Sequence, residues 1–521
     1  MTTPTRSLNV PAAPPWCGAL AGLGSGAVGV AVGTAVAALL DGVPSPVISV
    51  GNRAVDLAPP FLKDFAVRQF GTADKAVLIA GTLAVLAAVV TAAGLLGRRR
   101  PGMAYGIVVL LGLVGVVATA FDRTSTASRA LTILPALVTV LVTLGALHFL
   151  LGTLQMRPQS TDELPSGFDR RLFLKAVVGV GAVAVAAAAV GRFVGGTAAS
   201  VSRAAIRIVR PSSPAAAVPP GADLGVAGVT PYITPNSDFY RVDTALVVPD
   251  VPAEGWSLRV HGLVDRELRF GFRDLMAMPL VERRITLTCV SNEVGGPYVG
   301  NATWIGVPMR DLLERAGVRS GADAVKSTSA DGWTCGTPLS ALTDSRNALV
   351  AIAMNGEPLP LQHGFPARMV VPGLYGYVSA TKWLVDLEVT RFADFTAYWT
   401  SRGYAATAPI KMSSRIDVPR SFQTMSGGEV TFGGVAWAQA VGIAQVQVRV
   451  DDGEWHQADL GTRDGIESWR QWSWTWREAT PGRHEVSVRA VDETGTTQIS
   501  ERAPIRPDGA TGWHTVQFSV A

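Results

Sequence analysis

A single cysteine, Cys289, ends a stretch that alternates as a strand and opens onto an irregular loop. Residues 285–292 are Ile-Thr-Leu-Thr-Cys-Val-Ser-Asn, and this alternation of β-branched residues predicts a strand. The run that follows, 295–301, is rich in Gly, Pro and Asn and predicts a loop. A thiol at such a junction can present its sulfur to a bound group, and a thiolate is a soft metal ligand. The alternative is a buried and inert thiol, which is common among free cysteines.

Four sequence blocks that include or follow Cys289 resemble the sulfite-oxidase family, in which one cysteine thiolate binds a molybdenum carried by a pterin dithiolene. The blocks are Thr288-Cys-Val-Ser-Asn292, Trp304-Ile-Gly-Val-Pro-Met-Arg-Asp-Leu-Leu313, Met354-Asn-Gly-Glu-Pro-Leu-Pro360, and His363-Gly-Phe-Pro-Ala-Arg-Met-Val-Val-Pro-Gly373 with Lys382-Trp-Leu384. They occur in the family's order. The resemblance implies an α+β molybdopterin domain, a molybdenum–molybdopterin cofactor and Cys289 as the metal ligand.

The same resemblance implies which side chains contact the cofactor. They are Asn236, Tyr240, Arg241, Cys289, His363, Arg368, Ser379 and Lys382. An Asn can pair with the donor–acceptor edge of a pterin, and an Arg offers a planar fork to its phosphate. His363 can donate to a phosphate or to a pterin heteroatom. By itself, Arg241 would equally suit an ordinary surface ion pair.

The chain departs from the family pattern in two places. Sulfite oxidases have Gly-Ala-Arg where this chain has Gly376-Tyr377-Val378 and one extra residue, so only Ser379 and Lys382 carry over from that block. Sulfite oxidases also place arginines just after the cysteine block, to hold a dianionic substrate, whereas this chain has Glu293-Val-Gly-Gly. A carboxylate there would repel sulfite. We therefore expect the family's cofactor but leave its substrate open.

The remaining cysteines and the overall charge exclude several other classes of protein. Cys17, Cys289 and Cys335 are the only three cysteines and form no disulfide framework. No CxxC or clustered Cys/His spacing suggests zinc, an iron–sulfur cluster or a c-type haem. We interpret Cys335, in the turn-rich segment 331–338, as structural. The formal net charge of +4 gives no reason to expect a nucleic-acid partner.

The first two hundred residues are dominated by Ala, Val, Leu and Gly and contain five apolar runs. The runs are 18–40, 76–97, 103–120, 130–154 and 176–194. Each has about the length that a bilayer span needs, so we expect about five transmembrane helices. His148 is the only histidine before residue 261, which argues against a bis-histidine haem among these helices.

Basic residues predict the orientation of these spans. Arg98, Arg99 and Arg100 lie between the second and third runs without a neighbouring acid, which places that loop in the cytoplasm and the chain after residue 194 outside. The segment Asp169-Arg-Arg-Leu-Phe-Leu-Lys175 resembles a twin-arginine export signal, although it follows four spans rather than opening the protein. The alternative is that Arg170 and Arg171 are only positive-inside charges.

These features predict a chain of four regions. They are a membrane domain at 1–195, a linker at 196–225, a molybdopterin domain at 226–408 and an immunoglobulin-like β-sandwich at 409–521. The last region alternates short strands with turn signals and resembles the family's dimerisation domain. Trp472, Trp474 and Trp476 alternate on one strand face, which indicates a core or an interface. A carbohydrate-binding sandwich is the rival interpretation.

The sequence thus predicts a multi-pass, membrane-anchored oxidoreductase with its catalytic domain outside the cytoplasmic membrane. The expected reaction is two-electron oxygen-atom transfer on a small-molecule substrate. The expected partners are membrane lipid and an external electron-transfer partner, and a homodimer is left open. Two alternatives also stay open. The chain could reduce methionine sulfoxide or other S- and N-oxides, or it could be a non-catalytic membrane-anchored binding protein.

Overall fold

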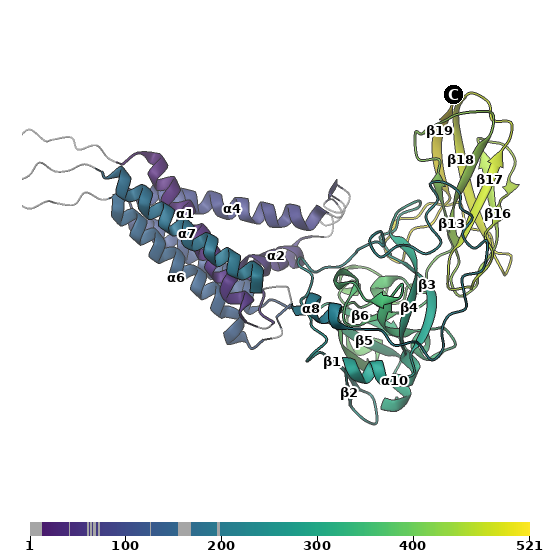
Figure 1. Ribbon diagram of the computed structural model, residues 1–521, viewed down its shortest axis with the longest axis horizontal. Coiled ribbons are helices and arrows are strands. Elements are labelled where there is room, and N and C mark those ends of the chain that lie inside the picture. Colours follow the sequence, from purple (N-terminus) through teal and green to yellow (C-terminus); the bar gives the residue numbers. More distant parts are fainter. Residues whose placement is uncertain are drawn as a thin grey trace, which may run out of the picture. The chain divides into compact units, whose positions relative to one another are not determined.

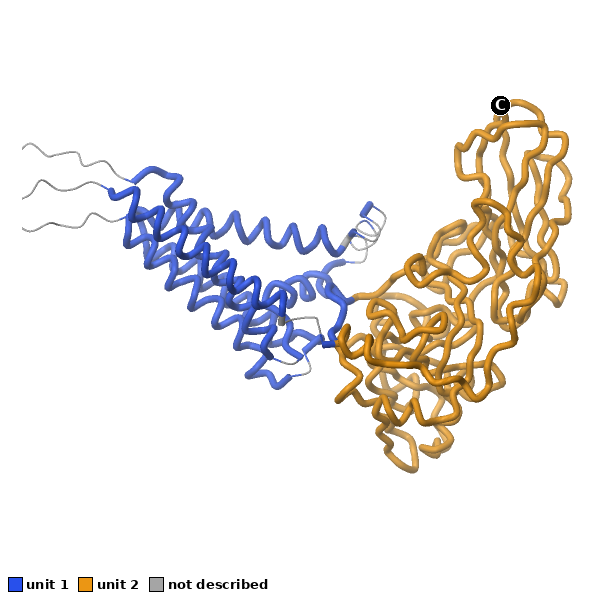
Figure 2. The backbone as a smooth tube through the Cα atoms, viewed as in Figure 1, with its two compact units in different colours: residues 1–198, 245–250 blue, residues 199–244, 251–521 orange. Residues whose placement is uncertain are grey.

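The computed structural model describes residues 13–40, 42–59, 62, 65, 69–70, 73–125, 127–154, 168–194 and 198–521. The chain divides into two compact units (Figure 2). Unit 1 comprises residues 1–198 and 245–250, and unit 2 comprises residues 199–244 and 251–521. Asp41, Lys63 and Asp64, between the first two predicted apolar runs, lie outside the described residues.

Unit 1 is helical. Its five long helices are α1 (Pro15–Ala38), α4 (Asp74–Gly97), α5 (Pro101–Ala120), α6 (Arg129–Leu154) and α7 (Arg170–Val194). All five are long and apolar enough to cross a membrane, and their positions match the five predicted apolar runs. The helix α7 begins six residues before the predicted run, so Arg170 and Arg171 belong to its first turn.

Two features of unit 1 do not follow from hydropathy alone. The segment between the first two apolar runs contains a helix, α2 (Pro46–Leu57), whose polar residues hide it from a search for apolar runs. Helices α1 and α4 approach so closely that a Cβ atom on Gly22 would overlap the carbonyl of Val90. Small residues at such crossings let helix backbones pack directly in a membrane-type bundle.

The first part of unit 2 contains two five-stranded sheets (Figure 1). One sheet has the order β2-β1-β10-β5-β6, and the other has the order β3-β4-β7-β8 with β9 paired to β7. The strands are β1 (Ser257–Gly262), β2 (Leu268–Gly271), β3 (Val281–Thr288), β4 (Val299–Pro308), β5 (Ala324–Ser329), β6 (Thr334–Pro338), β7 (Leu349–Met354), β8 (Glu357–Pro358), β9 (Arg368–Val370) and β10 (Leu384–Thr390). The short helices are α8 (Ala198–Ala205), α9 (Phe272–Ala277), α10 (Met309–Ala316) and α11 (Leu339–Thr343).

Local sequence signals explain several of these elements. The helix α10 follows Pro308 and ends at Gly317, whose positive φ of 71° gives a left-handed cap. The predicted loop at 331–338 is only partly a loop, because the turn ends before β6 and Cys335 lies inside that strand. The side chain of Cys335 is fully buried, in agreement with a structural role.

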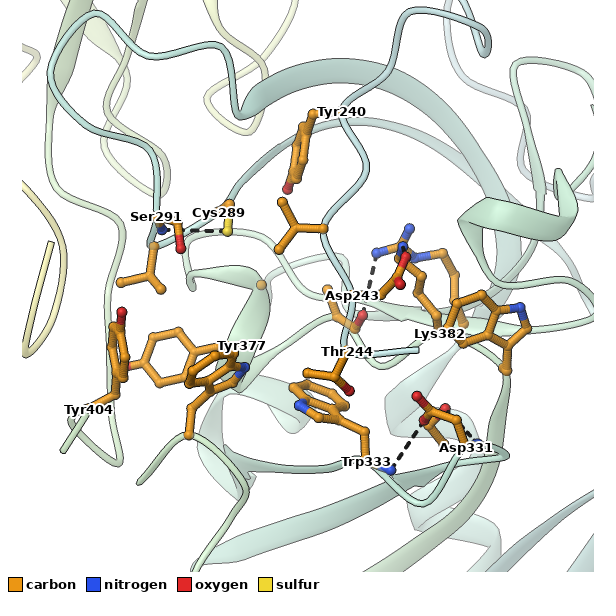
Figure 3. Close-up of a pocket in the computed structure, with 18 of the residues that line it drawn as sticks. Tyr240, Asp243, Thr244, Cys289, Ser291, Asp331, Trp333, Tyr377, Lys382 and Tyr404 are labelled. Atoms are coloured by element: carbon orange, nitrogen blue, oxygen red, sulfur yellow. Dashed lines mark hydrogen bonds and ion pairs between the residues drawn. The ribbon is translucent and has the colours of Figure 1, made fainter. Parts of the chain in front are cut away.

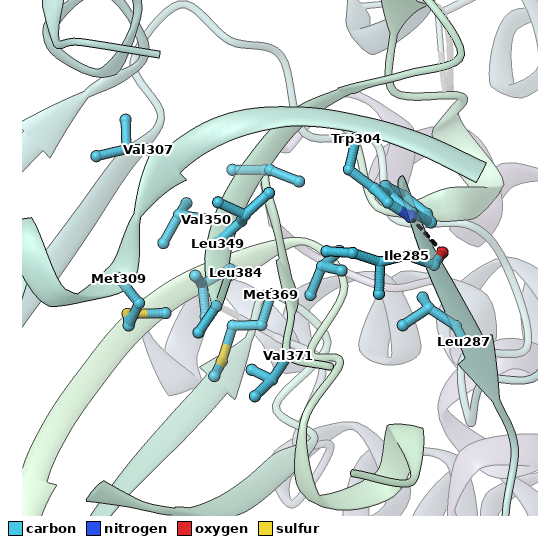
Figure 4. Close-up of a cluster of buried hydrophobic side chains, with 14 of the residues drawn as sticks. Ile285, Leu287, Trp304, Val307, Met309, Leu349, Val350, Met369, Val371 and Leu384 are labelled. Atoms are coloured by element: carbon cyan, nitrogen blue, oxygen red, sulfur yellow. Dashed lines mark hydrogen bonds between the residues drawn. The ribbon is translucent and has the colours of Figure 1, made fainter. Parts of the chain in front are cut away.

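The core beneath the site is formed by the β3–β4–β7–β9 sheet and by β10 (Figure 4). Trp304 is its largest member, and its indole N–H donates to the carbonyl of Ile285 over 3.1 Å. Ile285 and Leu287 project from β3 into the same cluster. The strand that leads to Cys289 is therefore fixed by buried apolar side chains and by a hydrogen bond that satisfies the one polar group of Trp304.

The last part of unit 2 has two further sheets that share one hydrophobic core. Their orders are β11-β13-β17-β16 and β12-β19-β18-β14-β15. The strands are β11 (Ser413–Val418), β12 (Thr424–Met425), β13 (Val430–Trp437), β14 (Ile443–Val450), β15 (His456–Gln457), β16 (Asp459–Leu460), β17 (Arg470–Trp476), β18 (Gly482–Asp492) and β19 (His514–Val520). Trp472 is fully buried and Trp474 stacks on Phe432, so the predicted tryptophan face is a core face.

Candidate active site

Cys289 follows β3 directly and lines a pocket in unit 2. Two hydrogen bonds fix the backbone around Cys289. The N–H of Cys289 donates to the carbonyl of Tyr298 over 2.9 Å, and the N–H of Tyr298 donates to Asn292 Oδ1 over 2.8 Å. The N–H of Ser291 points at the sulfur, 3.4 Å away. Only 9% of Cys289 is exposed, and this burial raises the pKa of its thiol, whereas the positive charge of Lys382 lowers it.

The pocket encloses about 870 Å³, including its open mouth (Figure 3). Four of the eight residues that the sequence singles out line it: Tyr240, Cys289, Arg368 and Lys382. They come from four separate segments, namely the 239–244 stretch, the end of β3, strand β9 and the segment before β10. The fold therefore gathers side chains that are up to 142 positions apart along the chain into one cavity.

Two cations in this pocket are almost removed from water. Arg368 is 4% exposed, donates only to backbone carbonyls and lies 5.1 Å over the ring of Trp304. Burial lowers the pKa of Arg368 to about 10. Burial also lowers the pKa of Lys382 to about 8, although the neighbouring carboxylate of Asp243 opposes this shift. Both cations would be stabilised by an added anion.

Asp243 is the only acid paired with these cations among the described residues. Its Oδ2 atom lies 2.9 Å from Lys382 Nζ and 3.0 Å from Arg241 Nε. One carboxylate therefore pairs with two cations, Arg241 and Lys382, while the printed hydrogen bonds of Arg368 all go to backbone carbonyls. Sequence reasoning missed Asp243, although its spacing from Arg241 in an extended segment places both side chains on one side.

Unpartnered polar atoms also suggest a bound group. Thr244 Oγ1, Thr288 Oγ1 and His363 Nδ1 are buried and have no hydrogen-bond partner. Buried polar groups are normally paired, and of these three residues Thr244 lines the pocket. The donor set therefore fits a pterin cofactor with a phosphate and a metal: a thiol, two buried cations and an unpaired hydroxyl.

The other four predicted residues do not line the pocket. Ser379 is fully buried and its hydroxyl lies 3.0 Å from the carbonyls of Leu374 and Tyr375. The amide of Asn236 is engaged by Met354, Asn355 and Glu357. The side chain of Arg241 is held by Asp243. These side chains support the walls of the pocket in this structure.

His363 is the fourth of these residues, and its hydrogen bonding assigns its tautomer. Its Nε2 lies 3.2 Å from the carbonyl of Asn236, which can only accept, so Nε2 carries the hydrogen. Burial, helped by the charges of Lys382 and Arg368, lowers the pKa of His363 to about 3, so the ring is neutral. Nδ1 is then an acceptor, whereas the sequence suggested a donor to phosphate.

Glu293 does not lie where the sequence placed it, beside a substrate at Cys289. The side chain of Glu293 is exposed and is not part of the pocket wall. Glu293 begins a tight turn, in which Gly296 N–H donates to the Glu293 carbonyl over 2.8 Å. Its carboxylate therefore does not face a substrate beside Cys289.

Aromatic side chains form another wall that sequence reasoning missed. Trp333, Tyr377, Trp399 and Tyr404 line the pocket, and in Figure 3 Tyr377 and Tyr404 lie on the opposite side of the view from Lys382. Tyr377 and Tyr404 contact each other with ring centroids 5.4 Å apart. Tyr377 was visible only as a departure from the family's Gly-Ala-Arg, and nothing in the local sequence marks Trp399 or Tyr404.

The C-terminal sheets hold two parts of this pocket in place. Arg415 Nη1 donates to the carbonyl of Gly296 over 3.2 Å, and the imidazole of His514 packs against Gly295, where any side chain would overlap it. Both glycines belong to the loop that follows Cys289. At the aromatic wall, Tyr377 Oη donates to Ala405 O over 2.8 Å, and Ala405 N–H donates to Pro507 O over 2.9 Å.

We predict that His514 makes unit 2 sensitive to acid. Burial lowers the pKa of His514 from 6.5 to about 4, so between these values the unfolded chain binds a proton that the folded chain does not. The free energy of unfolding should therefore fall as the pH drops from about 6.5 to about 4, by no more than about 3 kcal/mol. In His514→Gln the free energy of unfolding should depend less steeply on pH over this range. The part of the pH dependence that comes from His363 should remain.

Tryptophan fluorescence during urea unfolding in detergent measures this slope, because 12 of the 13 tryptophans follow residue 255. His456→Gln, at an exposed position in the same sheets, is the control. Equal slopes for His514→Gln and the wild type would show that the imidazole is not held neutral at this contact.

Comparison with known proteins gives the same assignment as the pocket. Residues 245–399 match the family described as "Oxidoreductase molybdopterin binding domain". Mitochondrial sulfite oxidase of Homo sapiens is 30% identical over 346 residues, which cover 56% of this chain and 62% of that protein. The uncharacterized oxidoreductase YuiH of Bacillus subtilis (strain 168) is 36% identical over 176 residues, which cover 33% of this chain and 85% of that protein.

Among solved structures, the sulfane dehydrogenase SoxCD from Paracoccus pantotrophus is 23% identical, with a TM-score of 0.47, and the match covers 54% of this chain and 80% of that one. The chain spans less than two thirds of the length of the mammalian sulfite oxidases that it matches. On the matches to the molybdopterin domain and to these relatives, the chain belongs to the sulfite-oxidase family of molybdopterin-dependent oxidoreductases, and its cofactor is molybdenum–molybdopterin.

Proposed function

We propose that the protein transfers an oxygen atom, together with two electrons, to or from a small-molecule substrate on the outer side of the cytoplasmic membrane. The observation that carries this proposal is that the Cys289 thiol lines the same pocket as the buried cations Arg368 and Lys382. A thiolate suits the metal, and the cations suit the pterin phosphate. A structural thiol would not need such neighbours.

When bound, the molybdenum cofactor would supply the two-electron redox change and the oxygen transfer. Cys289 would ligate the metal, and the metal's charge would favour the thiolate that burial alone disfavours. Arg368 and Lys382 would bind the phosphate or the pterin, with Asp243 holding Lys382 and Arg241 in place. Burial raises the pKa of Tyr240, so its hydroxyl keeps its proton and stays neutral beside the cofactor.

A second candidate function is the reduction of methionine sulfoxide or another neutral S- or N-oxide. It is favoured by the aromatic wall of Trp333, Tyr377, Trp399 and Tyr404, which offers apolar surface rather than cations to a substrate. A dianion such as sulfite needs positive charge beyond that used by the cofactor. Turnover of sulfite against a set of sulfoxides, measured with the purified, cofactor-loaded protein, separates the two candidates.

The remaining regions have roles that follow from this proposal. We propose that α1, α4, α5, α6 and α7 anchor the chain in the membrane, with residues 98–100 in the cytoplasm, and that the 196–225 linker connects them to a molybdopterin domain at 226–408. The 409–521 region would be an immunoglobulin-like domain of the dimerisation type, supported by its two sheets around one core. An external protein would exchange electrons with the cofactor.

We predict that Cys289→Ser keeps the fold and the pterin but loses turnover, because an alkoxide is a harder donor than a thiolate and suits molybdenum less well. The matched control is Cys335→Ser, which changes a fully buried thiol outside the pocket. Molybdenum and pterin content, the spectrum of the metal and turnover are measured for both variants. Full turnover by Cys289→Ser with an unchanged metal spectrum would remove Cys289 from the site.

We also predict that export depends on Arg170 and Arg171 as arginines. The double variant Arg170→Lys with Arg171→Lys keeps both charges, so a purely electrostatic anchor would tolerate it. A receptor that reads the guanidinium fork would not, since Lys lacks that geometry. Protease accessibility of unit 2 in intact spheroplasts reports its location. A wild-type level of exposed unit 2 in the twin-lysine variant would show that another route exports it.

A further inference from the structure

Two arginines and two tryptophans form a cluster on the C-terminal sheet that contains β14, β18 and β19. Arg449 lies on β14 and Arg489 on the neighbouring strand β18, and the pairing of Gln447 with Arg489 places both arginines on one face. Trp455 comes directly before β15, and Trp513 directly before β19. Val446, Val448 and Val488 point to the opposite face, into the core between the sheets, so the cluster belongs to the outer face.

Each guanidinium group in this cluster stacks on both indole rings. Arg489 lies 4.2 Å from the ring centre of Trp455 and 5.6 Å from that of Trp513. Arg449 lies 4.9 Å and 5.8 Å from the same two rings. The indoles contact each other edge to face with centroids 5.0 Å apart. Stacking fixes the planes of both guanidinium groups and therefore reduces the entropy that they would lose on binding.

The charge of this cluster is not balanced within the described part of the chain. No described acid lies within ion-pairing distance of Arg449 or Arg489. The one side-chain hydrogen bond of Arg489 goes from its Nε to Gln447 Oε1 over 2.8 Å. Arg449 Nε is buried and has no hydrogen-bond partner. Burial and the charge of Arg449 together lower the pKa of Arg489. Two neighbouring guanidinium groups without a paired acid can bind carboxylates or another anion through charge-assisted hydrogen bonds.

The residue types indicate what kind of anion this face takes. Trp and Arg are the side chains that most often dominate protein–protein interfaces, and unpaired charge selects a partner of opposite sign. A sugar would need an open indole face, whereas both guanidinium groups lie over the ring of Trp455. We propose that Arg449, Arg489, Trp455 and Trp513 form a docking site for an acidic segment of a partner protein. This site is outside the cofactor pocket and does not depend on the proposed reaction.

The test uses the full-length, cofactor-loaded protein in detergent and a fluorescently labelled oligoglutamate peptide of about ten residues as the probe. Binding is followed by anisotropy at low salt. In the double variant Arg449→Gln with Arg489→Gln, affinity should fall by about tenfold or more, because both bidentate contacts are lost. Raising the salt from about 20 to about 200 mM should weaken wild-type binding, as expected for charge pairing near a surface.

The control is Arg463→Gln in the loop between β16 and β17, which removes an arginine that is already paired with Glu493 at 2.7 Å and should leave the affinity unchanged. A second variant, Arg449→Lys with Arg489→Lys, keeps both charges and guards against loss of folding in the glutamine variant. It should bind more weakly than the wild type, because Lys lacks the planar fork. The unfolding temperature of each variant confirms that it is folded.

Three results would overturn the proposal. The first is equal affinity for oligoglutamate in the wild type and in the folded double variants. The second is tighter binding of inorganic polyphosphate than of oligoglutamate, lost in the same variants, which would make this a phosphate site. The third is a wild-type dimer that the double variant converts to monomer, which would make this face an interface between two copies of the chain.

Discussion

The charge of Arg368 is nearly removed from water, and no described carboxylate neutralises it. Its guanidinium group donates only to backbone carbonyls and lies over the ring of Trp304, while the nearby Lys382 shares one carboxylate, Asp243, with Arg241. Burying an uncompensated cation costs several kcal/mol, which a protein tolerates only where a ligand offsets it. The cofactor's anionic phosphate is the group that would offset it, so the walls of the pocket make physical sense as a site for a charged cofactor.

Cys289 needs equally exact support, because a metal ligand must be held in a fixed position. That support comes from two directions. Strand β3 is fixed by the core around Trp304, and the loop after the cysteine is held by Arg415 and His514 from the C-terminal sheets. The same sheets reach the aromatic wall through Pro507 and Ala405. The C-terminal region is therefore part of the active-site architecture, whatever its role in assembly.

The parts of this account that the sequence could predict are those with local signals. The strand before Cys289, the helix α10 closed by Gly317 and the apolar helices of unit 1 follow from residue patterns over short windows. The family resemblance could be recognised because four sequence blocks occur in the same order as in the family. The helix α2 was not predicted because it is short and polar. Cys335 was predicted to lie in a loop because turn-forming residues come directly before the strand that contains it.

The site was harder to predict because its contacts join distant segments. Asp243 acts through Lys382, 139 positions away, and Trp399 and Tyr404 reach the pocket from an irregular segment. A sequence pattern carries no information about such pairings. Likewise, the residue type of Glu293 suggested repulsion of sulfite, but only the backbone turn decides where its carboxylate points. Ser379 matches a cofactor-binding motif, but its hydroxyl donates to backbone carbonyls within the fold and does not line the pocket.

The central claim is that Cys289 binds the molybdenum of a cofactor held in this pocket. Anomalous diffraction from crystals of the cofactor-loaded protein, collected on both sides of the molybdenum absorption edge, locates the metal directly. The account predicts one molybdenum peak within bonding distance of Cys289 Sγ, with density for the pterin extending toward Arg368 and Lys382. A molybdenum peak away from Cys289, in a protein shown by chemical analysis to contain its pterin, would contradict it.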